Sequence, residues 1–100
     1  MIATLEDIPE NFYSDVQKAI GYLKEIGCSE IFLFGSLVSG KTSDSSDIDI
    51  AVKGIRPADY FSIYGELMLK LSHSVDLVDM DMQPGFSASL ERQDSLFRVA

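Results

Sequence analysis

The stretch that decides the fold is residues 30–53, EIFLFGSLVSGKTSDSSDIDIAVK. Its first part, Glu30 to Phe34, is mostly apolar and rich in aromatic and branched side chains, which predicts a buried strand. Gly35-Ser36 ends that strand, and a short helical turn from Ser36 followed by a polar loop is expected. Asp47 to Lys53 alternates in polarity, which predicts a second strand. Because only about ten residues join these two strands, we expect them to pair side by side.

The flanking segments predict helices, a third strand and a short tail. A helix opens at Pro9, because proline has no N–H to lose at the first helical position, and Gly27 ends it. Helical spacing of apolar residues supports this helix and a later one; the residues are Phe12, Val16, Ala19, Ile20, Leu23 and Ile26, then Tyr60, Phe61, Tyr64, Leu67, Met68 and Leu71. Val75 to Met80 predicts a third strand, Ser87 to Arg92 a last short helix, and Leu96 to Val99 an edge strand. This order predicts an α+β fold with helices on one face of a sheet.

Length and composition describe one small domain, which we expect to span residues 1–100. With 46% hydrophobic residues the chain can bury a core, so disorder is not expected. The formal net charge of −8 argues against a broad nucleic-acid footprint, because such a surface repels phosphates. An anionic ligand must then be bound locally, by metal ions, helix N-termini and a few basic side chains.

Cysteine usage and the N-terminal segment both predict a cytoplasmic protein. The single cysteine, Cys28, excludes an intrachain disulfide. The first residues lack the basic and apolar regions of a signal peptide, and no apolar run is long enough to span a membrane.

The second predicted strand carries the first candidate chemistry, the pair Asp47 and Asp49. Side chains alternate along a strand, so the two carboxylates share one face while Ile48 and Ile50 share the other. Adjacent carboxylates repel each other, and a hard divalent cation such as Mg²⁺ relieves that repulsion. Paired carboxylates can hold two such ions about 4 Å apart for phosphoryl transfer. An isolated Asp-x-Asp is more often a solvated acidic turn, so its surroundings decide the interpretation.

Gly35-Ser36 stands ten residues upstream of this pair. Glycine lets a phosphate approach the backbone, and the serine hydroxyl and nearby N–H groups can donate hydrogen bonds to it. Taken alone, an ordinary Gly-Ser turn is the more common explanation. The combination of Gly-Ser, ten residues and Asp-x-Asp arises by chance in roughly one chain in a hundred of this composition. Positive charge for such a phosphate can come from Lys41, Lys53 or Arg56, or from a metal ion alone.

A third carboxylate on the predicted strand Val75 to Met80 strengthens the metal-site hypothesis. If this strand lies next to the Asp-x-Asp strand, Asp76 completes a triad and supplies a group to activate an attacking hydroxyl. Asp79 and Asp81 are rivals, and we expect both to face solvent at the end of the strand. Asp76 is therefore the predicted third acid.

The segment GSLVSGKTSDSSDIDIAV resembles the signature of the polymerase-beta-like nucleotidyltransferases, and the chain is similar in size to their minimal bacterial and archaeal members. The resemblance covers essentially the whole chain and implies a small mixed β-sheet with helices packed on it. It also implies that Gly35 and Ser36 hold a nucleoside triphosphate such as ATP, with Lys41 as our candidate for its charge. The implied catalytic acids, which bind two Mg²⁺ ions, are Asp47, Asp49 and Asp76.

The resemblance also implies a partner. The smallest members of this family are commonly encoded beside a HEPN-domain ribonuclease toxin and act as its antitoxin, some by transferring AMP to a toxin tyrosine. We therefore predict a Mg²⁺-dependent nucleotidyltransferase that transfers AMP from ATP to a hydroxyl on a partner protein. Membrane association is not expected.

One departure from the family pattern motivates two alternatives. Many relatives carry arginines just after Gly-Ser, where this chain has Leu37-Val38-Ser39. The chain would then be a binding antitoxin of the same fold with little or no catalysis. The other alternative is a small-molecule nucleotidyltransferase of the aminoglycoside-modifying type. One hundred residues leave little room for its second domain unless two copies build the pocket, so homo-oligomers and hetero-oligomers both stay open.

Other conspicuous residues receive structural interpretations. His73 is expected to be an exposed turn residue, because a lone histidine shows no ligand spacing. Cys28 is expected to be a small, partly buried residue without nucleophilic partners. The aromatic residues Tyr60, Phe61 and Tyr64 are expected in the core rather than on a base-stacking surface.

Overall fold

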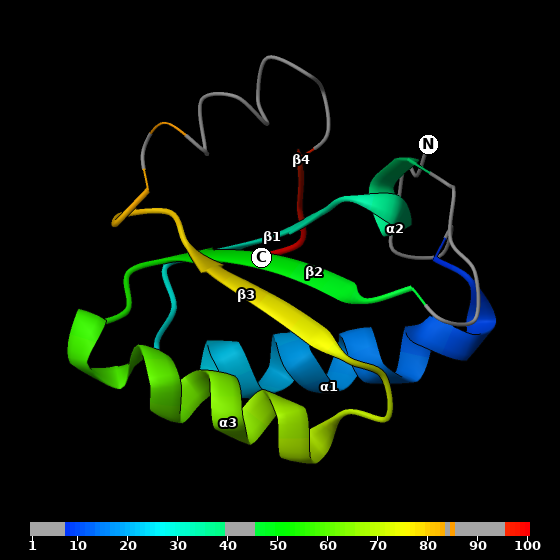
Figure 1. The fold of residues 1–100 in the computed structure, drawn as a ribbon, viewed down its shortest axis with the longest axis horizontal. Coiled ribbons are helices and arrows are strands. Elements are labelled where there is room, and N and C mark those ends of the chain that lie inside the picture. The colour runs from blue at the N-terminus through cyan, green and yellow to red at the C-terminus, as the bar shows by residue number, and fades with distance from the viewer. Residues whose placement is uncertain (1–7, 40–45, 84, 86–95) are drawn as a thin grey trace.

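The central element of the fold is a four-stranded mixed sheet (Figure 1). The computed structural model describes residues 8–39, 46–83, 85 and 96–100. The strands are β1 (Glu30–Phe34), β2 (Ile48–Lys53), β3 (Val75–Asp79) and β4 (Leu96–Arg98), in the spatial order β3-β2-β1-β4. β1 is antiparallel to both β2 and β4, whereas β2 is parallel to β3. The predicted strands are confirmed, including the pairing of the two central ones and the C-terminal edge strand.

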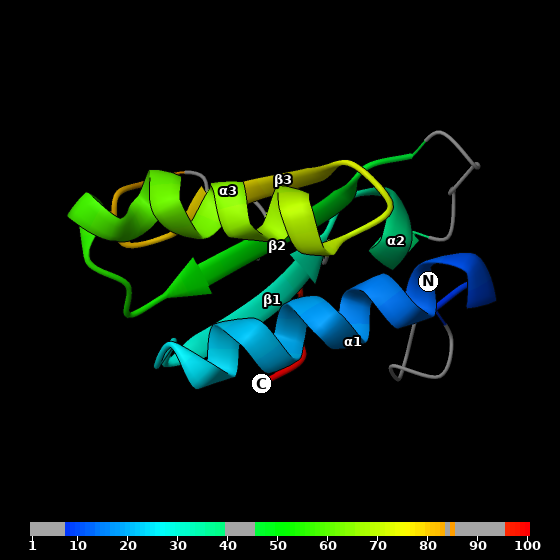
Figure 2. The same cartoon turned by 90° about the horizontal axis from the view of Figure 1, so that it is seen from below.

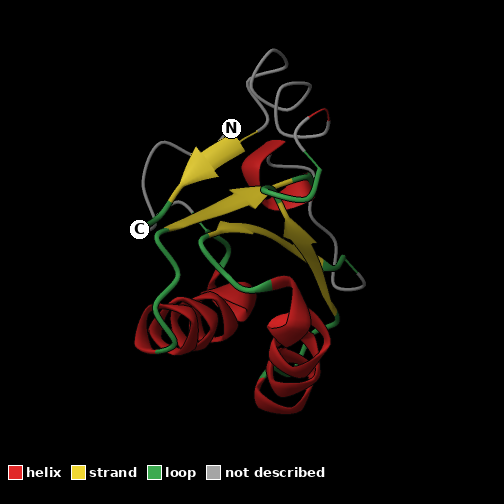
Figure 3. Ribbon diagram, turned by 90° about the vertical axis from the view of Figure 1, so that its left-hand side faces the viewer, coloured by secondary structure: helices red, strands yellow, loops and turns green. Residues whose placement is uncertain are grey.

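Two long helices, α1 (Glu10–Glu25) and α3 (Tyr60–Lys70), cover one face of the sheet, as Figures 2 and 3 show. A 3-10 turn (Pro57–Asp59) leads into α3, which forms the crossover between the parallel strands β2 and β3. The helices bury their apolar stripes against the sheet, and the fully buried large side chains include Phe12, Leu23, Ile31, Leu33, Leu37, Ile48, Ile50, Leu67 and Leu77. The predicted α+β architecture is confirmed.

Gly27 ends α1 as its sequence position predicts. Its φ of +94° lies in the left-handed region that favours glycine, and a Cβ there would meet nothing within 4 Å. The N–H of Cys28 donates to the carbonyl of Leu23, and the N–H of Gly27 donates to that of Lys24, both at 3.1 Å. This pair of bonds is the Schellman arrangement, which satisfies carbonyls at the end of the helix and aims the chain into β1.

The other face of the sheet carries a smaller apolar cluster, formed by Phe32, Phe34, Ala51, Val78 and Met80 with Leu96 packed against it. The short helix α2 (Ser36–Ser39), predicted from Gly35-Ser36, follows β1 directly (Figure 1). The expected helix over residues 87–92 lies outside the described residues. Within the described part of the chain, no helix has the length and apolar character needed to cross a membrane.

The aromatic prediction for α3 is partly wrong. Tyr60 and Tyr64 are partly buried against the core, but the Phe61 side chain is 83% exposed. Met68, which also follows helical spacing, is 58% exposed. Apolar periodicity reveals a helix, but α3 carries apolar residues on most of its circumference, and only packing decides which of them face inward.

Candidate active site

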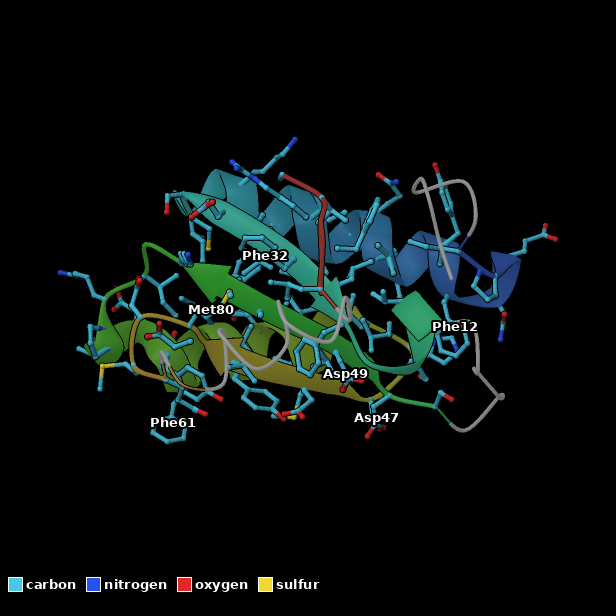
Figure 4. The ribbon with its side chains drawn as sticks, turned by 90° about the horizontal axis from the view of Figure 1, so that it is seen from above. Phe12, Phe32, Asp47, Asp49, Phe61 and Met80 are labelled. Carbon is cyan, nitrogen blue, oxygen red and sulfur yellow. The ribbon has the colours of Figure 1, made fainter. Side chains whose placement is uncertain are left out.

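The acid pair lies at the start of β2 with the predicted alternation. Ile48 and Ile50 point into the core and are fully buried. Asp49 is half-buried on the opposite face, and Asp47, immediately before the strand, is exposed. Figure 4 shows the two aspartates next to each other, on the face away from α1 and α3. The strand therefore presents two carboxylates on the face that the long helices leave open.

The third candidate, Asp76, lies directly beside Asp49 because β2 and β3 are in register. The paired residues are Asp49 and Asp76, on neighbouring parallel strands. Such strands run about 4.8 Å apart, so the two side chains leave the same face as neighbours. The Asp76 side chain is exposed, at the outer edge of the sheet. The predicted placement of Asp76 is thus confirmed, while its catalytic role stays a prediction.

Gly35 lies against the same carboxylate from the other side. Phe34 pairs with Asp49 in the β1–β2 register, and Gly35 follows with a φ of +74°. A Cβ on Gly35 would stand 2.1 Å from Oδ2 of Asp49, which is closer than any real contact. Only glycine accepts both this backbone conformation and this approach. Gly35 therefore makes room for the Asp49 carboxylate, a role that the sequence pattern did not reveal.

Ser36 opens α2 next to this carboxylate. The turn is closed by the N–H of Val38, which donates to the carbonyl of Gly35 at 3.1 Å. Gly35 and Ser36 thus stand beside the acids, as the spacing predicted. Lys41, the remaining nucleotide-binding candidate, lies outside the described residues.

Electrostatics at the site call for a cation. Burial raises the pKa of Asp49 to about 6, and the nearby carboxylates of Asp76 and Asp47 add to the rise. Within residues 8–39, 46–83, 85 and 96–100, none of the three acids forms an ion pair with a lysine, arginine or histidine. Like charges on neighbouring strands destabilise a sheet unless a positive charge lies between them.

A divalent metal ion fits this donor set. Three carboxylates that have no cationic side-chain partner among the described residues offer the hard oxygen ligands that Mg²⁺ prefers. In the side-chain positions of the described residues, no three such groups already stand close enough to hold an ion. The structure thus supplies ligands of the right chemistry, and their candidate metal-binding role stays a prediction for Asp47, Asp49 and Asp76.

Two of the predicted sources of positive charge lie elsewhere. Lys53 ends β2, four residues beyond Asp49, and its Nζ lies 3.7 Å from Oε2 of Glu30. Arg56 is exposed, with its Nε 2.8 Å from Oδ2 of Asp59. At about 3.3 Å per residue, four strand residues separate Lys53 from the acids by roughly 13 Å. In this structure, therefore, the Lys53 and Arg56 side chains are paired with other carboxylates and do not place a positive charge beside Asp49.

The expectation that Asp79 faces solvent is wrong. Asp79 is 4% exposed, because its position on β3 points its side chain toward the helix-covered face. Its Oδ1 accepts a hydrogen bond from the N–H of Asp81 at 3.0 Å. Asp81 is exposed as expected, and its Oδ2 accepts from the N–H of Gly54 at 2.9 Å. Both rivals therefore stabilise the turn after β3 and leave Asp76 as the acid that accompanies Asp49.

The expectation that His73 is an exposed turn residue is also wrong. Its ring packs on Phe12 with centroids 4.2 Å apart, and its Nδ1 lies 2.8 Å from Oδ2 of Asp15. Asp15 is buried and also accepts hydrogen bonds from both backbone N–H groups of Ser72 and His73. Burial alone would raise the pKa of Asp15, but the His73 and Ser72 hydrogen bonds outweigh it and lower the pKa to about 2. The signal missed in the sequence was a carboxylate three residues after Phe12, on the apolar stripe of α1.

This carboxylate bears on the site by holding the segment that leads into β3. Ser72 and His73 bond to Asp15, and the next residue, Ser74, accepts a hydrogen bond from the N–H of Ile48 at 2.8 Å. The phenolic hydroxyl of Tyr64 donates to the carbonyl of Val75 at 2.8 Å, and that of Tyr60 donates to the carbonyl of Leu77. These contacts position β3, and hence Asp76, from both ends of α3.

Cys28 keeps the structural interpretation that the sequence suggested. It is half-buried, and burial together with the Asp79 carboxylate raises the pKa of its thiol. A raised pKa disfavours the thiolate, which is the nucleophilic form.

A mixed sheet that presents three carboxylates beside a Gly-Ser turn defines a site suited to phosphoryl or nucleotidyl transfer. The family model described as Polymerase beta, Nucleotidyltransferase, matches residues 17–97. The chain therefore belongs to the polymerase beta nucleotidyltransferase family, and its general reaction is nucleotidyl transfer. Members of this family generally use a nucleotide substrate and a divalent metal. No curated protein sequence matches the chain.

Proposed function

We propose that the protein transfers AMP from ATP to a hydroxyl group of a partner protein, with Mg²⁺ as its cofactor. The observation that carries this proposal is the register of β2 with β3, which brings Asp76 to one side of Asp49, while Gly35 lies against the Asp49 carboxylate on the other side. The raised pKa of Asp49 supports a bound cation, because a positive charge offsets both the burial and the neighbouring carboxylates that raise this pKa.

In the proposed reaction, an acceptor hydroxyl attacks the α-phosphorus of ATP. A bond forms between the hydroxyl oxygen and phosphorus, the bond to the pyrophosphate oxygen breaks, and the hydroxyl proton passes to the carboxylate of Asp76. Asp47 and Asp49 would hold the metal, which when bound neutralises charge on the phosphates. Gly35 leaves the space that the Asp49 carboxylate occupies, and Ser36 would donate hydrogen bonds to a phosphate oxygen.

The proposed acceptor is a HEPN ribonuclease toxin, which the protein neutralises as an antitoxin. The match to minimal nucleotidyltransferases in size and signature supports this acceptor. The position of the acids also supports a protein acceptor, because Asp47 and Asp76 are exposed rather than enclosed in a deep pocket. A tyrosine on the surface of another protein can reach carboxylates placed in this way.

The test measures label transfer from α-labelled ATP to a co-purified toxin. We expect Asp47→Asn combined with Asp49→Asn to abolish labelling while the circular dichroism spectrum is retained. The matched control combines Glu10→Gln with Glu25→Gln, which removes the same charge from exposed positions on α1. Labelling that persists in the folded aspartate variant would falsify the proposal.

A second candidate function is neutralisation by binding alone. The residues that replace the relatives' arginines, Leu37 and Val38, are buried in the core. Lys53 and Arg56 are also committed elsewhere, so the described residues leave few cations for a triphosphate. Growth rescue of toxin-expressing cells distinguishes the two functions. Rescue by the Asp47/Asp49 double variant favours binding alone, and loss of rescue favours catalysis.

A further inference from the structure

The outward side of α3 is an apolar stripe with no cover in the described chain. Ile63 and Leu67 face the core, while Phe61 is 83% exposed and Leu69 84% exposed. Met68 is 58% exposed and follows Phe61 by seven residues, on the same side of the helix. Figure 4 shows Phe61 directed away from the sheet. Residues spaced by seven and eight positions lie on one side of a helix, so these side chains form a continuous stripe.

A glycine stands in the middle of this stripe. Gly65 is the sixth of the eleven residues of α3, and a Cβ placed on it would meet nothing within 4 Å. A glycine inside a helix lowers the helical population about fivefold relative to alanine. Because a Cβ at this position would meet nothing, packing within the described chain does not require a glycine here. Gly65 does, however, allow another backbone to approach the helix closely at this point.

The two most exposed side chains of the stripe, Phe61 and Leu69, are placed symmetrically about Gly65. Phe61 precedes the glycine by four residues, and Leu69 follows it by four. If two copies of α3 cross antiparallel on a two-fold axis at Gly65, Phe61 of each copy lies opposite Leu69 of the other. Small residues at a crossing point shorten the distance between helix axes and let the flanking side chains interlock.

We propose that this face is an interface between two copies of the chain, paired through α3 on a two-fold axis at Gly65. Beside the stripe, Phe61 and Met82 line a hollow of about 220 Å³ together with Pro57, Tyr60, Asp79 and Gln83. This hollow gives the protruding Leu69 of the second copy a place to pack.

The exposed area is close to what a dimer requires. A large apolar side chain presents about 150–250 Å², so the exposed fractions of Phe61, Met68, Leu69 and Met82 amount to roughly 600 Å² per copy. A standard specific interface buries about 800 Å² per partner. The backbone around Gly65 and the polar residues at the rim of α3 would supply the remaining area.

The charged residues of α3 do not repel a second copy of the helix. The chain carries a net charge of −8, but α3 contains one acid and one base, Glu66 and Lys70, which form an ion pair at 3.9 Å. The acids Asp47 and Asp49 lie on the other face of the sheet. A dimer through α3 therefore keeps the negative charge of each site away from the interface.

The sharpest test places a cysteine on the proposed axis. In a Cys28→Ser background, Gly65→Cys puts two thiols face to face at the crossing point, within the range of a disulfide. The matched control is Gly21→Cys, because Gly21 also lies inside a helix with nothing near its Cβ position, but among polar neighbours. Under mild oxidation at micromolar protein concentration, we expect disulfide-linked dimers from the Gly65 variant and not from the Gly21 variant. Equal cross-linking in both variants, or none in either, overturns the proposal.

Sedimentation equilibrium provides an independent measurement without oxidation. We expect the wild-type chain to dimerise at about 200 µM and Leu69→Gln to weaken the association at least tenfold. Ile26→Gln is the control, because Ile26 is another exposed apolar side chain but lies away from the stripe, at the end of α1. A wild-type chain that stays monomeric at this concentration contradicts the proposal, as does a Leu69 variant that associates as tightly as the wild type.

Discussion

Replacing the Asp49 carboxylate by an amide is expected to stabilise the metal-free protein at neutral pH. In the folded chain the pKa of Asp49 rises from 3.8 to about 6, through burial and the charges of Asp76 and Asp47. An acid whose folded-state pKa is raised costs stability once it ionises, so the free energy of unfolding falls as pH rises from about 4 to about 6. At about 1.4 kcal/mol for a change of one in pKa, a rise from 3.8 to about 6 corresponds to about 3 kcal/mol. Partial exposure of Asp49 makes about 2 kcal/mol the expected gain of Asp49→Asn at pH 8.

The assay is urea denaturation followed by circular dichroism, with EDTA present, at several pH values from about 4 to 8. The variant should match the wild type at the acid end, where Asp49 is protonated, and exceed it by a margin that grows between about pH 4 and pH 6 and stays constant above pH 6. Asp47→Asn removes the same charge from an exposed position and should gain clearly less. With millimolar Mg²⁺ in place of EDTA, the gap should narrow, because only the wild type keeps the ligand that binds the ion.

Equal stabilities of Asp49→Asn and the wild type at pH 8 in EDTA would refute the reasoning, since the carboxylate would then carry no electrostatic cost. A gap that does not change with pH would refute it as well, because it would trace to packing of the amide rather than to ionisation.

Three further substitutions test the roles of Gly35, Asp15 and Leu37. Gly35→Ala should reduce nucleotidyl transfer at least tenfold, because its Cβ would displace the Asp49 carboxylate; Gly27→Ala, which strains a positive φ without a clash, should cost about 1 kcal/mol of stability and keep full activity. Asp15→Ala should lower the free energy of unfolding by about 2–4 kcal/mol in a thermal or urea melt, since it leaves buried donors without an acceptor. Because the pKa of Asp15 is lowered, the wild type should lose the stability that this carboxylate contributes as the pH falls from about 4 to about 2, and the Asp15 variant should show no such loss. If the free energy of unfolding of both proteins changed equally over this pH range, the stabilising role of Asp15 would be contradicted. Leu37→Arg should destabilise the protein by about 3 kcal/mol or more rather than tighten ATP binding measured by calorimetry, because position 37 is in the core.

Much of the site could be predicted from local pattern. The alternation of Asp47 to Ile50 places carboxylates and core residues on opposite faces whatever the sheet contains, and Gly35-Ser36 ends a strand for local steric reasons. Asp76 was predicted by its position in the third strand, and the register with Asp49 confirms that position. The error on Asp79 has a different origin. We expected it to face solvent because it lies at the end of the strand, but it has the same parity on β3 as Val75 and Leu77 and is buried with them.

The helices and strands and the two local signatures, the Gly-Ser turn and the Asp-x-Asp strand, could be predicted from local sequence alone, because they depend on backbone preferences and on the two-residue period of a strand. Which groups come into contact depends on how these elements pack. The tertiary structure brought Asp15 to His73 across 58 residues, placed the Asp49 carboxylate against Gly35, and committed Lys53 and Arg56 to carboxylates far from the acids. The physical reason is that contacts between distant segments follow strand register and helix packing, which no local pattern encodes.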